Sequence, residues 1–519
     1  MGILPVPAGV VERPLDPAVD CGYRLTARKI QHPIHAAQRC WCARPPGACR
    51  DHPAVEPVHR QWAADRQREV KGRQTVNDRV FVLIGAGSTI FTPGLLRDLA
   101  AAAPFGDFTV RLVDVDPEAA ETMAALGRRY AEHYGSGMRV EAFADRREAL
   151  TGARFVTTTI AVGSVAARRK DFEIPARYGI QQTVGDTVGP GGVLRALRHV
   201  PELVAIAEDV ADRSPQAWMM NYSNPLTANV RAITKHTAVS AVGLCHGTMH
   251  SKAALARDLG LDPDAVHAVF AGINHLCWLL DIRSDGVDLY PRLRELVEAR
   301  SGDRNAPSNR REGVHAAVSA DLMRTFGLYP APGDRHVAEF FSDYLQLADS
   351  GELAWGLQGG QDMAFENMAG KHDLWDGIRA QVSGSQVLDV SQDKESERLV
   401  TIAGALLSGR DHLELAVNLP NNGKIPNLPA TAVVEVPAVA GASGITGLAV
   451  GPLPDAIAAV LTARAHQQEL TVQAAISGER QVALQALLLD PLVPDAATAR
   501  AILDDAVNAD PSALHRFAA

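Results

Sequence analysis

The sequence has few cysteines, no excess of basic residues and no long apolar run. Six cysteines among 519 residues do not form a disulfide framework, so we expect a reducing, cytoplasmic compartment. A formal net charge of −9 leaves no basic face for a nucleic acid. No run approaches the roughly 18 apolar residues of a membrane span, and the first residues, Met1 to Pro5, lack the features of a secretory signal. We therefore expect neither a nucleic-acid partner nor a membrane span.

The rest of the composition is that of a globular protein with a sizeable core. Hydrophobic residues make up 46% of the chain and charged residues 21%, which are ordinary values. A chain of 519 residues is long for one domain, and we expect two or three. The pattern of strands and helices changes along the chain, and it predicts one domain in residues 79–245 and another in residues 246–519.

Residues 1–78 differ in composition from the rest of the chain. They are rich in Pro, Arg, His and Cys, and no apolar period persists. We interpret them as a disordered or non-native extension, and we hypothesise that translation truly begins at Val70 or Val76. The alternative is a zinc site, although the spacing fits no standard zinc motif. Its ligands would come from His35, Cys40, Cys42, Cys49 and His52.

Regular structure is predicted from Arg79 onward, beginning with a glycine turn. Residues 80–84 form a continuous apolar run, as in a buried parallel strand. The turn Gly85-Ala86-Gly87-Ser88 comes next, and residues 93–102 are predicted to be a helix. Glycines let the backbone approach a pyrophosphate, and a helix N-terminus supplies amide donors. This arrangement indicates a dinucleotide site that uses Gly85, Gly87 and Ser88.

An acidic residue follows the next predicted strand. Residues 109–113 lead to Asp114, whose carboxylate is suited to accept hydrogen bonds from ribose hydroxyls. The spacing from Gly85 is 114 − 85 = 29 residues, longer than the usual spacing of about 20, and Ile90 stands where a third glycine is expected. The alternative is a tight turn in some other doubly wound protein.

A second glycine-rich stretch precedes a long predicted helix. The run Gly185-Asp186-Thr187-Val188-Gly189-Pro190-Gly191-Gly192 comes after a predicted strand at residues 155–160 and leads into a helix at residues 193–210. So many glycines suit the close approach of a ligand. The alternative is a flexible loop before a helix.

Polar side chains follow the next two predicted strands. Residues 218–220 lead to Asn221 and Asn224, and the Asn-Pro step predicts a rigid, extended corner. Residues 239–244 lead to Cys245. We expect both amides to point outward from the carboxyl edge of the sheet, where such folds bind ligands.

Cys245 and His275 form a candidate metal pair. They lie 275 − 245 = 30 residues apart, each after an apolar run. The four close ligands of a structural zinc site are absent from the sequence. Two ligands with open positions instead suggest a catalytic metal that water and substrate oxygens complete. The alternative is that Cys245 is simply a buried cysteine.

After about residue 280 the pattern changes to longer helices and mixed strands. Residues 322–326 are predicted to be helical, and residues 416–419 form a strand that ends in a hairpin-type turn at Asn421-Asn422-Gly423. Residues 432–436 plausibly pair with that strand. Residues 455–489 are predicted to be mostly helix with a break at Gly478.

A series of short motifs from Arg79 to the C-terminus resembles glycoside hydrolase family 4, whose members are NAD-dependent exceptions among glycosidases. The order and spacing of the motifs make the resemblance specific. The motifs are Gly85-Ala86-Gly87-Ser88, Leu112-Val113-Asp114, Gly185 to Gly192, Asn221-x-x-Asn224-Pro225, Cys245-His246-Gly247, Gly272-Ile273-Asn274-His275, Asn421-Asn422-Gly423 and Val434-Glu435-Val436-Pro437.

The resemblance implies a fold, two cofactors and a reaction. The fold is α/β, with a Rossmann-like doubly wound parallel sheet and a C-terminal α+β catalytic and oligomerisation domain like that of lactate dehydrogenase. The cofactors are NAD⁺ and Mn²⁺, or another divalent metal, with Cys245 and His275 as metal ligands. NAD⁺ would oxidise C3 of the sugar, the C2 proton would leave, the C1–oxygen bond would break, and water would then add. A homodimer or homotetramer is implied.

The resemblance also implies roles for single residues. Asn224 would contact sugar hydroxyls, Asn221 would line the cofactor cleft, and Asp186 would contact substrate or a metal-bound water. The Cys245-His246-Gly247 series is similar to members that act on non-phosphorylated α-glycosides: glucosides, galactosides and uronides. His246 would then be the acid for the leaving group, or a residue that orients the metal site.

Three candidates remain for the base that removes the C2 proton. Asp334 ranks first, as base or as relay to a metal-bound hydroxide, and its alternative is an ion pair with Arg335 or another cation. Tyr329 is the second candidate, although its register is uncertain, and the metal-bound hydroxide itself is the third. His336 would add a metal ligand or pack.

Two other functions compete with this prediction. The first is an NAD-dependent 2-hydroxy-acid dehydrogenase of the lactate or malate type, which would need a His-Asp pair and an arginine but no metal. The second is a nucleotide-binding regulator without turnover. The Cys245/His275 pair argues against the dehydrogenase, which needs no metal. Cys245, His275 and Asp334 together argue against the regulator, which would have no chemical need for them.

Overall fold

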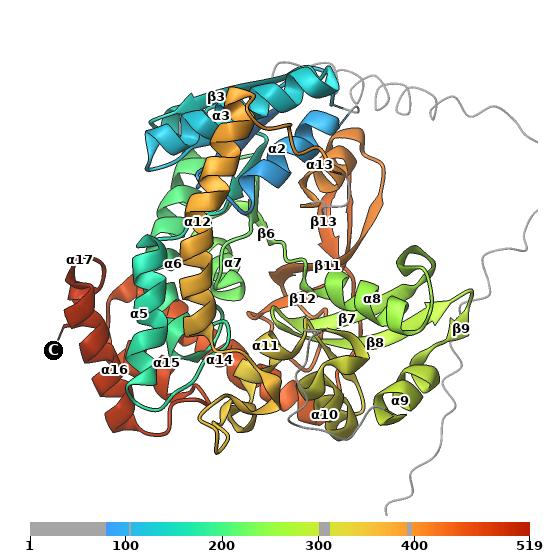
Figure 1. Ribbon diagram of the computed structural model, residues 1–519, viewed down its shortest axis with the longest axis vertical. Coiled ribbons are helices and arrows are strands. Elements are labelled where there is room, and N and C mark those ends of the chain that lie inside the picture. Colours follow the sequence, from blue (N-terminus) through green and yellow to red (C-terminus); the bar gives the residue numbers. More distant parts are fainter. Residues whose placement is uncertain (1–78, 103–104, 300–311, 392–396, 519) are drawn as a thin grey trace, which may run out of the picture. The chain divides into compact units, whose positions relative to one another are not determined.

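A computed structural model of the chain describes residues 79–102, 105–299, 312–391 and 397–518 (Figure 1). Residues Thr75–Ala519 group into one unit and Met1–Gln74 into another. The extension predicted for residues 1–78, its zinc site and the two alternative starts lie outside the described residues.

The described strands form one sheet, in the order β10-β8-β7-β12-β11-β6-β5-β4-β1-β2-β3, with β9 paired to β8 and β13 to β12. The half that runs β3-β2-β1-β4-β5-β6 is parallel throughout. This is the strand order of a doubly wound dinucleotide-binding fold, so the predicted α/β class is confirmed. The strands are β1 (Val80–Ile84), β2 (Phe108–Val113), β3 (Met138–Phe143), β4 (Phe155–Thr158), β5 (Trp218–Asn221), β6 (Ser240–Gly243), β7 (His267–Ile273), β8 (Leu276–Ser284), β9 (Val287–Asp288), β10 (Tyr329–Ala331), β11 (His412–Pro420), β12 (Val433–Gly441) and β13 (Gly444–Gly447).

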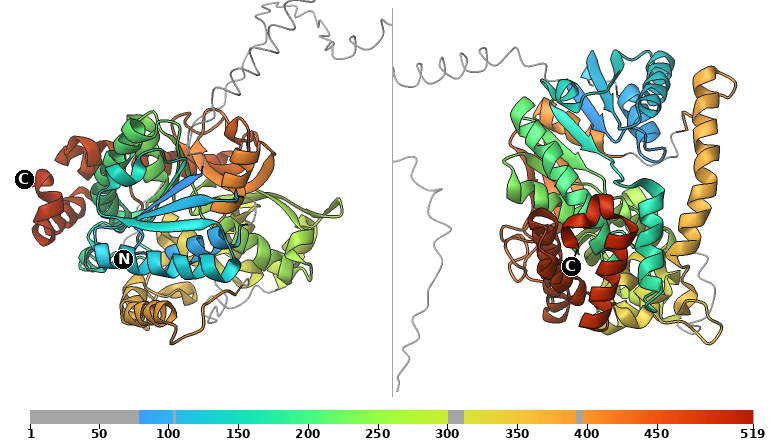
Figure 2. Two further views of the ribbon diagram at one scale, coloured as in Figure 1. Left: turned by 90° about the horizontal axis from the view of Figure 1, so that it is seen from above. Right: turned by 90° about the vertical axis from the view of Figure 1, so that its left-hand side faces the viewer.

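Helices connect and cover these strands. Helix α3 packs on α2 and β3, α6 packs on α7 and α14, and α12 touches both α3 and α5. Figure 2 shows α12 as one long helix along a side of the fold. The helices are α2 (Thr92–Ala101), α3 (Pro117–Tyr134), α4 (Arg146–Leu150), α5 (Ser164–Ala176), α6 (Gly189–Arg213), α7 (Leu226–His236), α8 (Gly247–Asp258), α9 (Tyr290–Ala299), α10 (Ala317–Phe326), α11 (Asp334–Val337), α12 (Gly360–Ser383), α13 (Leu399–Ser408), α14 (Asp455–Ser477), α15 (Arg480–Leu488), α16 (Ala496–Ala509) and α17 (Pro511–Leu514).

Burial on both faces explains the parallel half of the sheet. All five residues of β1 are buried, because helices cover both sides of a doubly wound sheet. The predicted run of residues 155–160 is β4 rather than the third strand, since β3 precedes it. The main differences in boundaries are that α6 extends beyond its predicted range at both ends, α10 begins earlier than predicted, and β11 begins at His412.

Strands β11 and β12 lie between the two halves of the sheet. They pair antiparallel, with Asn418 opposite Glu435, which confirms the predicted pairing. The predicted turn at Asn421-Asn422-Gly423 is present, since Asn422 and Gly423 have φ +42° and +85° and the Lys424 amide donates to the carbonyl of Asn421 at 2.9 Å. The whole connection to β12 is longer and runs through residues 421–432. The buried Asn421 side chain holds this longer loop, and its amide donates to the carbonyls of Ile425 and Leu428.

The sheet crosses the domain boundary that the sequence predicts at residue 245. Gly243 of β6 is the partner of Asn418 of β11, so the first half of the chain and the last share one sheet. The assignment of residues 79–245 and 246–519 to separate domains stays a prediction.

Candidate functional site

The predicted dinucleotide turn lies at the carboxyl end of β1. Gly85 has φ +87°, and a Cβ there would lie 2.8 Å from the backbone nitrogen of Ile160. Glycine is therefore required at the carboxyl end of β1, beside β4, where the strand order of the sheet reverses. Doubly wound folds bind their ligands at this point. Gly85, Gly87 and Ser88 are all partly exposed.

Asp114 stabilises this turn through hydrogen bonds. Its Oδ2 accepts a hydrogen bond of 2.7 Å from the amide of Gly87, and its Oδ1 accepts one of 3.0 Å from the amide of Asp116. The Ser88 hydroxyl accepts from the amide of Phe91 at 3.2 Å. The structure thus brings the predicted residues of the turn together with the predicted acid.

Asn221 turns inward instead of outward. It is fully buried, and its Oδ1 accepts from the Thr158 hydroxyl at 2.9 Å. Its Nδ2 donates to the carbonyl of Ser223 at 2.8 Å. The prediction that this amide points out of the sheet edge is wrong, because the amide holds the turn after β5 in shape.

Asn224, in contrast, belongs to a polar cluster. Its Nδ2 donates to Asp186 Oδ2 at 3.0 Å, and the Thr187 hydroxyl donates to Asp186 Oδ1 at 2.9 Å. The same hydroxyl lies 2.8 Å from His275 Nδ1. The His336 ring packs against the His275 ring with centroids 4.3 Å apart. Three of the predicted site residues, Asp186, Asn224 and His275, therefore meet.

The hydrogen bond to Thr187 determines which ring nitrogen of His275 carries the proton. The Thr187 hydroxyl donates its hydrogen to Asp186, so its oxygen accepts a hydrogen bond from Nδ1–H of His275. Burial lowers the pKa of His275, although the charge of Asp186 opposes this. The ring is then neutral with a lone pair on Nε2, which is the form that binds a metal.

Asp186 is held ionised by its surroundings. Burial alone raises its pKa, but His275, Arg168, Arg195 and His336 outweigh burial and bring the pKa to about 2. Burial also lowers the pKa of both histidines, so the two arginines carry the lasting positive charge. A carboxylate in this state accepts hydrogen bonds well and removes protons poorly.

The loop before Asp186 is fixed by a buried carboxylate that sequence reasoning missed. One oxygen of Glu339 accepts from the amides of Thr183, Val184 and Gly185, at 2.9, 2.8 and 2.8 Å. Burial raises the pKa of Glu339 to about 7. Because Glu339 comes from a distant part of the chain, no local pattern in the sequence points to it.

The second half of the predicted glycine-rich stretch, residues 189–192, is the first turn of α6, whereas residues 185–188 precede the helix. A Cβ at Gly192 would lie 2.7 Å from the backbone carbonyl carbon of Thr187, and one at Gly191 would lie 2.7 Å from the carbonyl oxygen of Asp171. The chain's own packing therefore requires these two glycines, and the close approach of a ligand to the stretch stays a prediction.

Cys245 follows β6 and is half-buried among apolar side chains. Burial, and then the charge of Glu435, raise the pKa of its thiol to about 12. The amide of Gly247 lies 3.4 Å from the sulfur. Without a cation this group is a neutral thiol, and a bound divalent ion would favour the thiolate.

A row of strand residues carries the two predicted metal ligands toward each other. Gly243 pairs with Asn418, Asn418 with Glu435, and Glu435 with Gly272. Cys245 and His275 follow the two ends of this row. The side chain of Asn274, next to His275, lies beside the Cys245 thiol and lowers its pKa.

The donors at this edge fit a divalent cation. A soft thiol and a neutral imidazole nitrogen suit borderline metals. Within the residues that the structure describes, no three His, Cys, Asp or Glu side chains gather closely enough to hold a metal alone. An ion held here would take its remaining ligands from outside the chain.

His246 lies at the start of α8 and faces a carboxylate. Its Nε2 is 3.2 Å from Oε2 of Glu397, and its ring lies against that of His250 with centroids 5.9 Å apart. Sequence reasoning missed Glu397, since nothing in the sequence indicates that so late a part of the chain returns to this corner.

The predicted base candidates have structural partners. Asp334 is buried, and its two oxygens accept from the amides of Val318 and Ser319 and from the Ser319 hydroxyl, so it caps the start of α10. Burial raises its pKa to about 6. Arg335 donates to the carbonyl of Thr183, and the alternative of an ion pair between Asp334 and Arg335 or another cation stays a prediction.

Tyr329 is fully buried in β10. Its hydroxyl donates to the carbonyl of Gly313 at 2.8 Å, and burial raises the pKa of the phenol well above its usual range. The structure therefore places Tyr329 in the core, away from any exposed surface.

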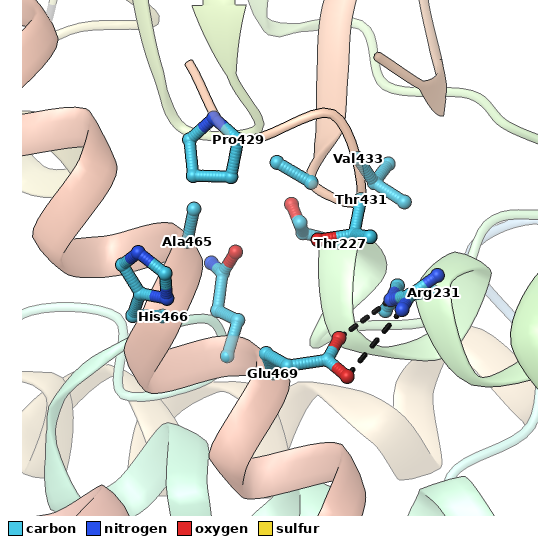
Figure 3. Close-up of a pocket in the computed structure, with 10 residues that line it drawn as sticks. Thr227, Arg231, Pro429, Thr431, Val433, Ala465, His466 and Glu469 are labelled. Atoms are coloured by element: carbon cyan, nitrogen blue, oxygen red, sulfur yellow. Dashed lines mark hydrogen bonds and ion pairs between the residues drawn. The ribbon is translucent and has the colours of Figure 1, made fainter. Parts of the chain in front are cut away.

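Figure 3 shows a small pocket elsewhere in the fold, between α7, the residues at the start of β12, and α14. An ion pair of 2.5 Å between Arg231 and Glu469 stands on one side of it. None of the predicted site residues lines this pocket, so it does not mark the site. Its lining is Thr227, Arg231, Pro429, Thr431, Ala432, Val433, Ala465, His466, Gln468 and Glu469.

A doubly wound sheet with a glycine turn at the point where β1 and β4 diverge defines a dinucleotide-binding class of enzyme. Comparison with known proteins makes the assignment specific. The family model described as family 4 glycosyl hydrolase matches residues 80–261, and the model of its C-terminal domain matches residues 270–493. The chain belongs to glycoside hydrolase family 4 and is a glycosidase by family, which favours the glycosidase prediction over the hydroxy-acid dehydrogenase.

Curated relatives cover most of the chain. An alpha-galactosidase from Bacillus subtilis (strain 168) is 32% identical over 409 residues, which are 79% of this chain and 92% of the relative. An alpha-galacturonidase from the same organism is 32% identical over 436 residues, 81% of this chain and 94% of the relative.

Solved structures have the same fold. The structure of lplD from Bacillus subtilis matches with a TM-score of 0.73 and 30% identity, over 82% of this chain and 99% of that one. A 6-phospho-alpha-glucosidase from gut microorganisms, solved in complex with NAD and Mn²⁺, matches with a TM-score of 0.72 and 22% identity, over 84% and 98%. No helix among the described residues is long and apolar enough to cross a membrane.

Proposed function

We propose that the protein hydrolyses the glycosidic bond of a non-phosphorylated α-glycoside (an α-galactoside, α-glucoside or α-uronide), with NAD⁺ and Mn²⁺ or another divalent metal as cofactors. The observation that carries the proposal is the linked set Asp186–Thr187–His275, which leaves the Nε2 lone pair of His275 for a metal. The alpha-galactosidase and alpha-galacturonidase relatives support the α-configuration and the unphosphorylated sugar. Cytoplasmic localisation and a homodimeric or homotetrameric state are part of the same proposal.

When bound, NAD⁺ supplies reversible oxidation of the sugar at C3, and the cation supplies positive charge beside the sugar oxygens. The glycine turn, with Gly85, Gly87 and Ser88 braced by Asp114, holds the dinucleotide. Cys245 and His275 hold the cation, and Cys245 gives up its proton as the ion binds.

The polar cluster holds the sugar. Asn224 and the ionised Asp186 offer hydrogen bonds to hydroxyls, and the arginines behind Asp186 keep it charged. His246 donates a proton to the leaving oxygen. Asp334 is not carried forward as the base, because both of its oxygens cap α10.

An assay of aryl α-galactosides, α-glucosides and α-uronides, with NAD⁺ and Mn²⁺, tests the proposal. One α-series should turn over, a chelator should abolish turnover, and Mn²⁺ with a reductant should restore it. Deuterium at C2 of the sugar should exchange with solvent or slow the reaction, because that proton moves. Full activity in chelator, together with complete retention of the label, would remove the proposal.

A further inference from the structure

Two buried polar atoms at the edge of the site have only each other as partners within the described part of the chain. His246 Nε2 and Glu397 Oε2 are both shielded from solvent and make no regular hydrogen bond to any other described group. They lie 3.2 Å apart. A buried polar group without a partner is costly, and a proton on Nε2 would pair both atoms at once.

Glu397 is held in place from several sides. Its carbonyl accepts from the Tyr222 hydroxyl at 2.6 Å, and its amide donates to Asp98 at 3.1 Å. Only 8% of the residue is exposed. The backbone of Glu397 is therefore held from two sides, and its buried carboxylate lies beside the His246 ring.

The next residue, Arg398, contacts Cys245, the residue before His246. Arg398 donates to the carbonyl of Cys245 at 3.1 Å, while Glu414 and the carbonyl of Ala416 accept from its second guanidinium nitrogen at 3.1 and 2.7 Å. Glu397 thus contacts His246, and Arg398 contacts Cys245, so these two pairs of neighbouring residues face each other.

We propose that Glu397 is a positioning residue for the glycosidase reaction, which holds the His246 ring through Nε2–H and leaves Nδ1 to face the leaving oxygen. A carboxylate that accepts from one imidazole nitrogen fixes the tautomer and orientation of the ring and stabilises its proton-bearing form. To act as the acid, the ring carries a proton on each nitrogen. The Nδ1 proton passes to the glycosidic oxygen as the C1–oxygen bond breaks, the bonding electrons stay with that oxygen, and the ring is left neutral with its Nε2–H on Glu397. This inference rests on the proposed function.

Substrates whose leaving groups differ in acidity test this role of Glu397. The Glu397→Gln variant should lower kcat by roughly 10- to 100-fold on a phenyl glycoside, the usual cost of losing such a partner, with little change in KM. On the 2,4-dinitrophenyl glycoside, whose leaving group needs little protonation, the loss should shrink below about threefold. An equal loss on both substrates would overturn the inference.

Glu414→Gln is the matched control. Glu414 is also buried and also contacts Arg398, but its second oxygen faces His412 rather than His246. This variant should affect the two glycosides equally. The double variant Glu397→Gln/His246→Gln should be no slower than His246→Gln alone, because Glu397 acts through the ring. Additive losses would show that Glu397 acts by another route.

A measurement without substrate separates this inference from the proposed function. In protein labelled with ¹⁵N-histidine, the ring signals that disappear in His246→Gln identify His246. These signals should shift in Glu397→Gln and stay in place in Glu414→Gln. Unshifted signals in Glu397→Gln would overturn the pairing, whereas wild-type protein inactive on every glycoside, with the shift observed, would count against the proposed function alone.

Discussion

The Thr187 hydroxyl lies between the carboxylate of Asp186 and the imidazole of His275. The hydroxyl donates to Asp186 and accepts from His275, so the negative charge of Asp186 determines which tautomer His275 adopts. Asn224 completes the set from a different strand end. The chemistry of the site therefore depends on a hydroxyl that lies within the predicted glycine-rich motif but had no predicted role of its own.

Replacing the candidate thiolate separates the two cofactors. We expect Cys245→Ser to weaken Mn²⁺ binding by more than the roughly 10- to 100-fold that loss of an outer partner costs, while NAD⁺ binding at Gly85 and Asp114 stays unchanged. Calorimetric titration with each cofactor measures this. Cys277→Ala is the control, because the buried thiol of Cys277 contacts the carbonyl of Ile273 instead. Normal Mn²⁺ binding by Cys245→Ser would remove Cys245 as a ligand.

Glu339 predicts a pH dependence of stability. Burial raises its pKa from the ordinary value of 4.5 to about 7. A raised folded-state pKa contributes stability below pH 4.5 that is lost as the pH rises through about 7. The free energy of unfolding should therefore fall by roughly 1–3 kcal/mol between pH 5 and pH 8 from this group. Glu339→Gln keeps an acceptor for the three amides and should flatten that slope in denaturant titrations. An unchanged slope would show that Glu339 is ionised throughout.

Single residues were predictable where a strand delivered them to the sheet edge. Asn224 follows β5 and His275 follows β7, and both meet Asp186 of the loop before α6. The rule does not say which way a side chain turns, so it put Asn221 outward. Partners that return from far along the chain, such as Glu397, leave no periodic signal.

At the scale of elements, the start of α6 sets the position of the polar cluster. Its first turn packs so closely on Thr187 that no side chain fits at Gly192. The helix then continues to Arg213, and its N-terminal end stays against the loop that carries Asp186.

Adding a methyl group at that contact should be costly. Gly192→Ala would place a Cβ 2.7 Å from backbone atoms that cannot move away, so we expect a loss of about 1–3 kcal/mol in the free energy of unfolding. Gly377→Ala in α12 is the control, since the nearest atom to a Cβ there is a Gln386 side-chain oxygen at 4.0 Å. That variant should be neutral or gain up to about 1 kcal/mol. Equal effects of both changes on urea unfolding would contradict the packing argument.

Elements with strong patterns were predictable, and edge elements were not. The apolar run of β1 and the break between α14 and α15 at Gly478 appear as predicted. Strand β3 was missed because it alternates buried and exposed residues at the edge of the sheet. The long loop of residues 421–432 was missed because Asn-Gly steps usually mark short turns.

At the scale of the molecule, both matched regions of the family contribute to one sheet. The first region supplies β1 to β6 and the second supplies most of β7 and the strands from β8 to β13. Strand β11 of the second region pairs directly with β6. The candidate site forms only when both regions are present.

The matched regions of the family do not include residues 1–79. Residues Thr75–Ala519 form a unit of their own, and the family match begins at residue 80. We expect a chain that starts at Thr75 to keep the melting temperature, NAD⁺ binding and glycosidase activity of the full chain. A loss of any of them in the shortened protein, with activity restored in the full chain, would show that the extension takes part.

The position of β11 sets an order for assembly during translation. Strand β6 ends at Gly243, and the strand that covers its edge is made only when synthesis reaches Asn418. A nascent chain therefore carries an open sheet edge for much of its synthesis, and such edges invite pairing with other chains. We conclude that this protein depends on protection by chaperones at the ribosome more than a fold whose strands pair in the order they are made.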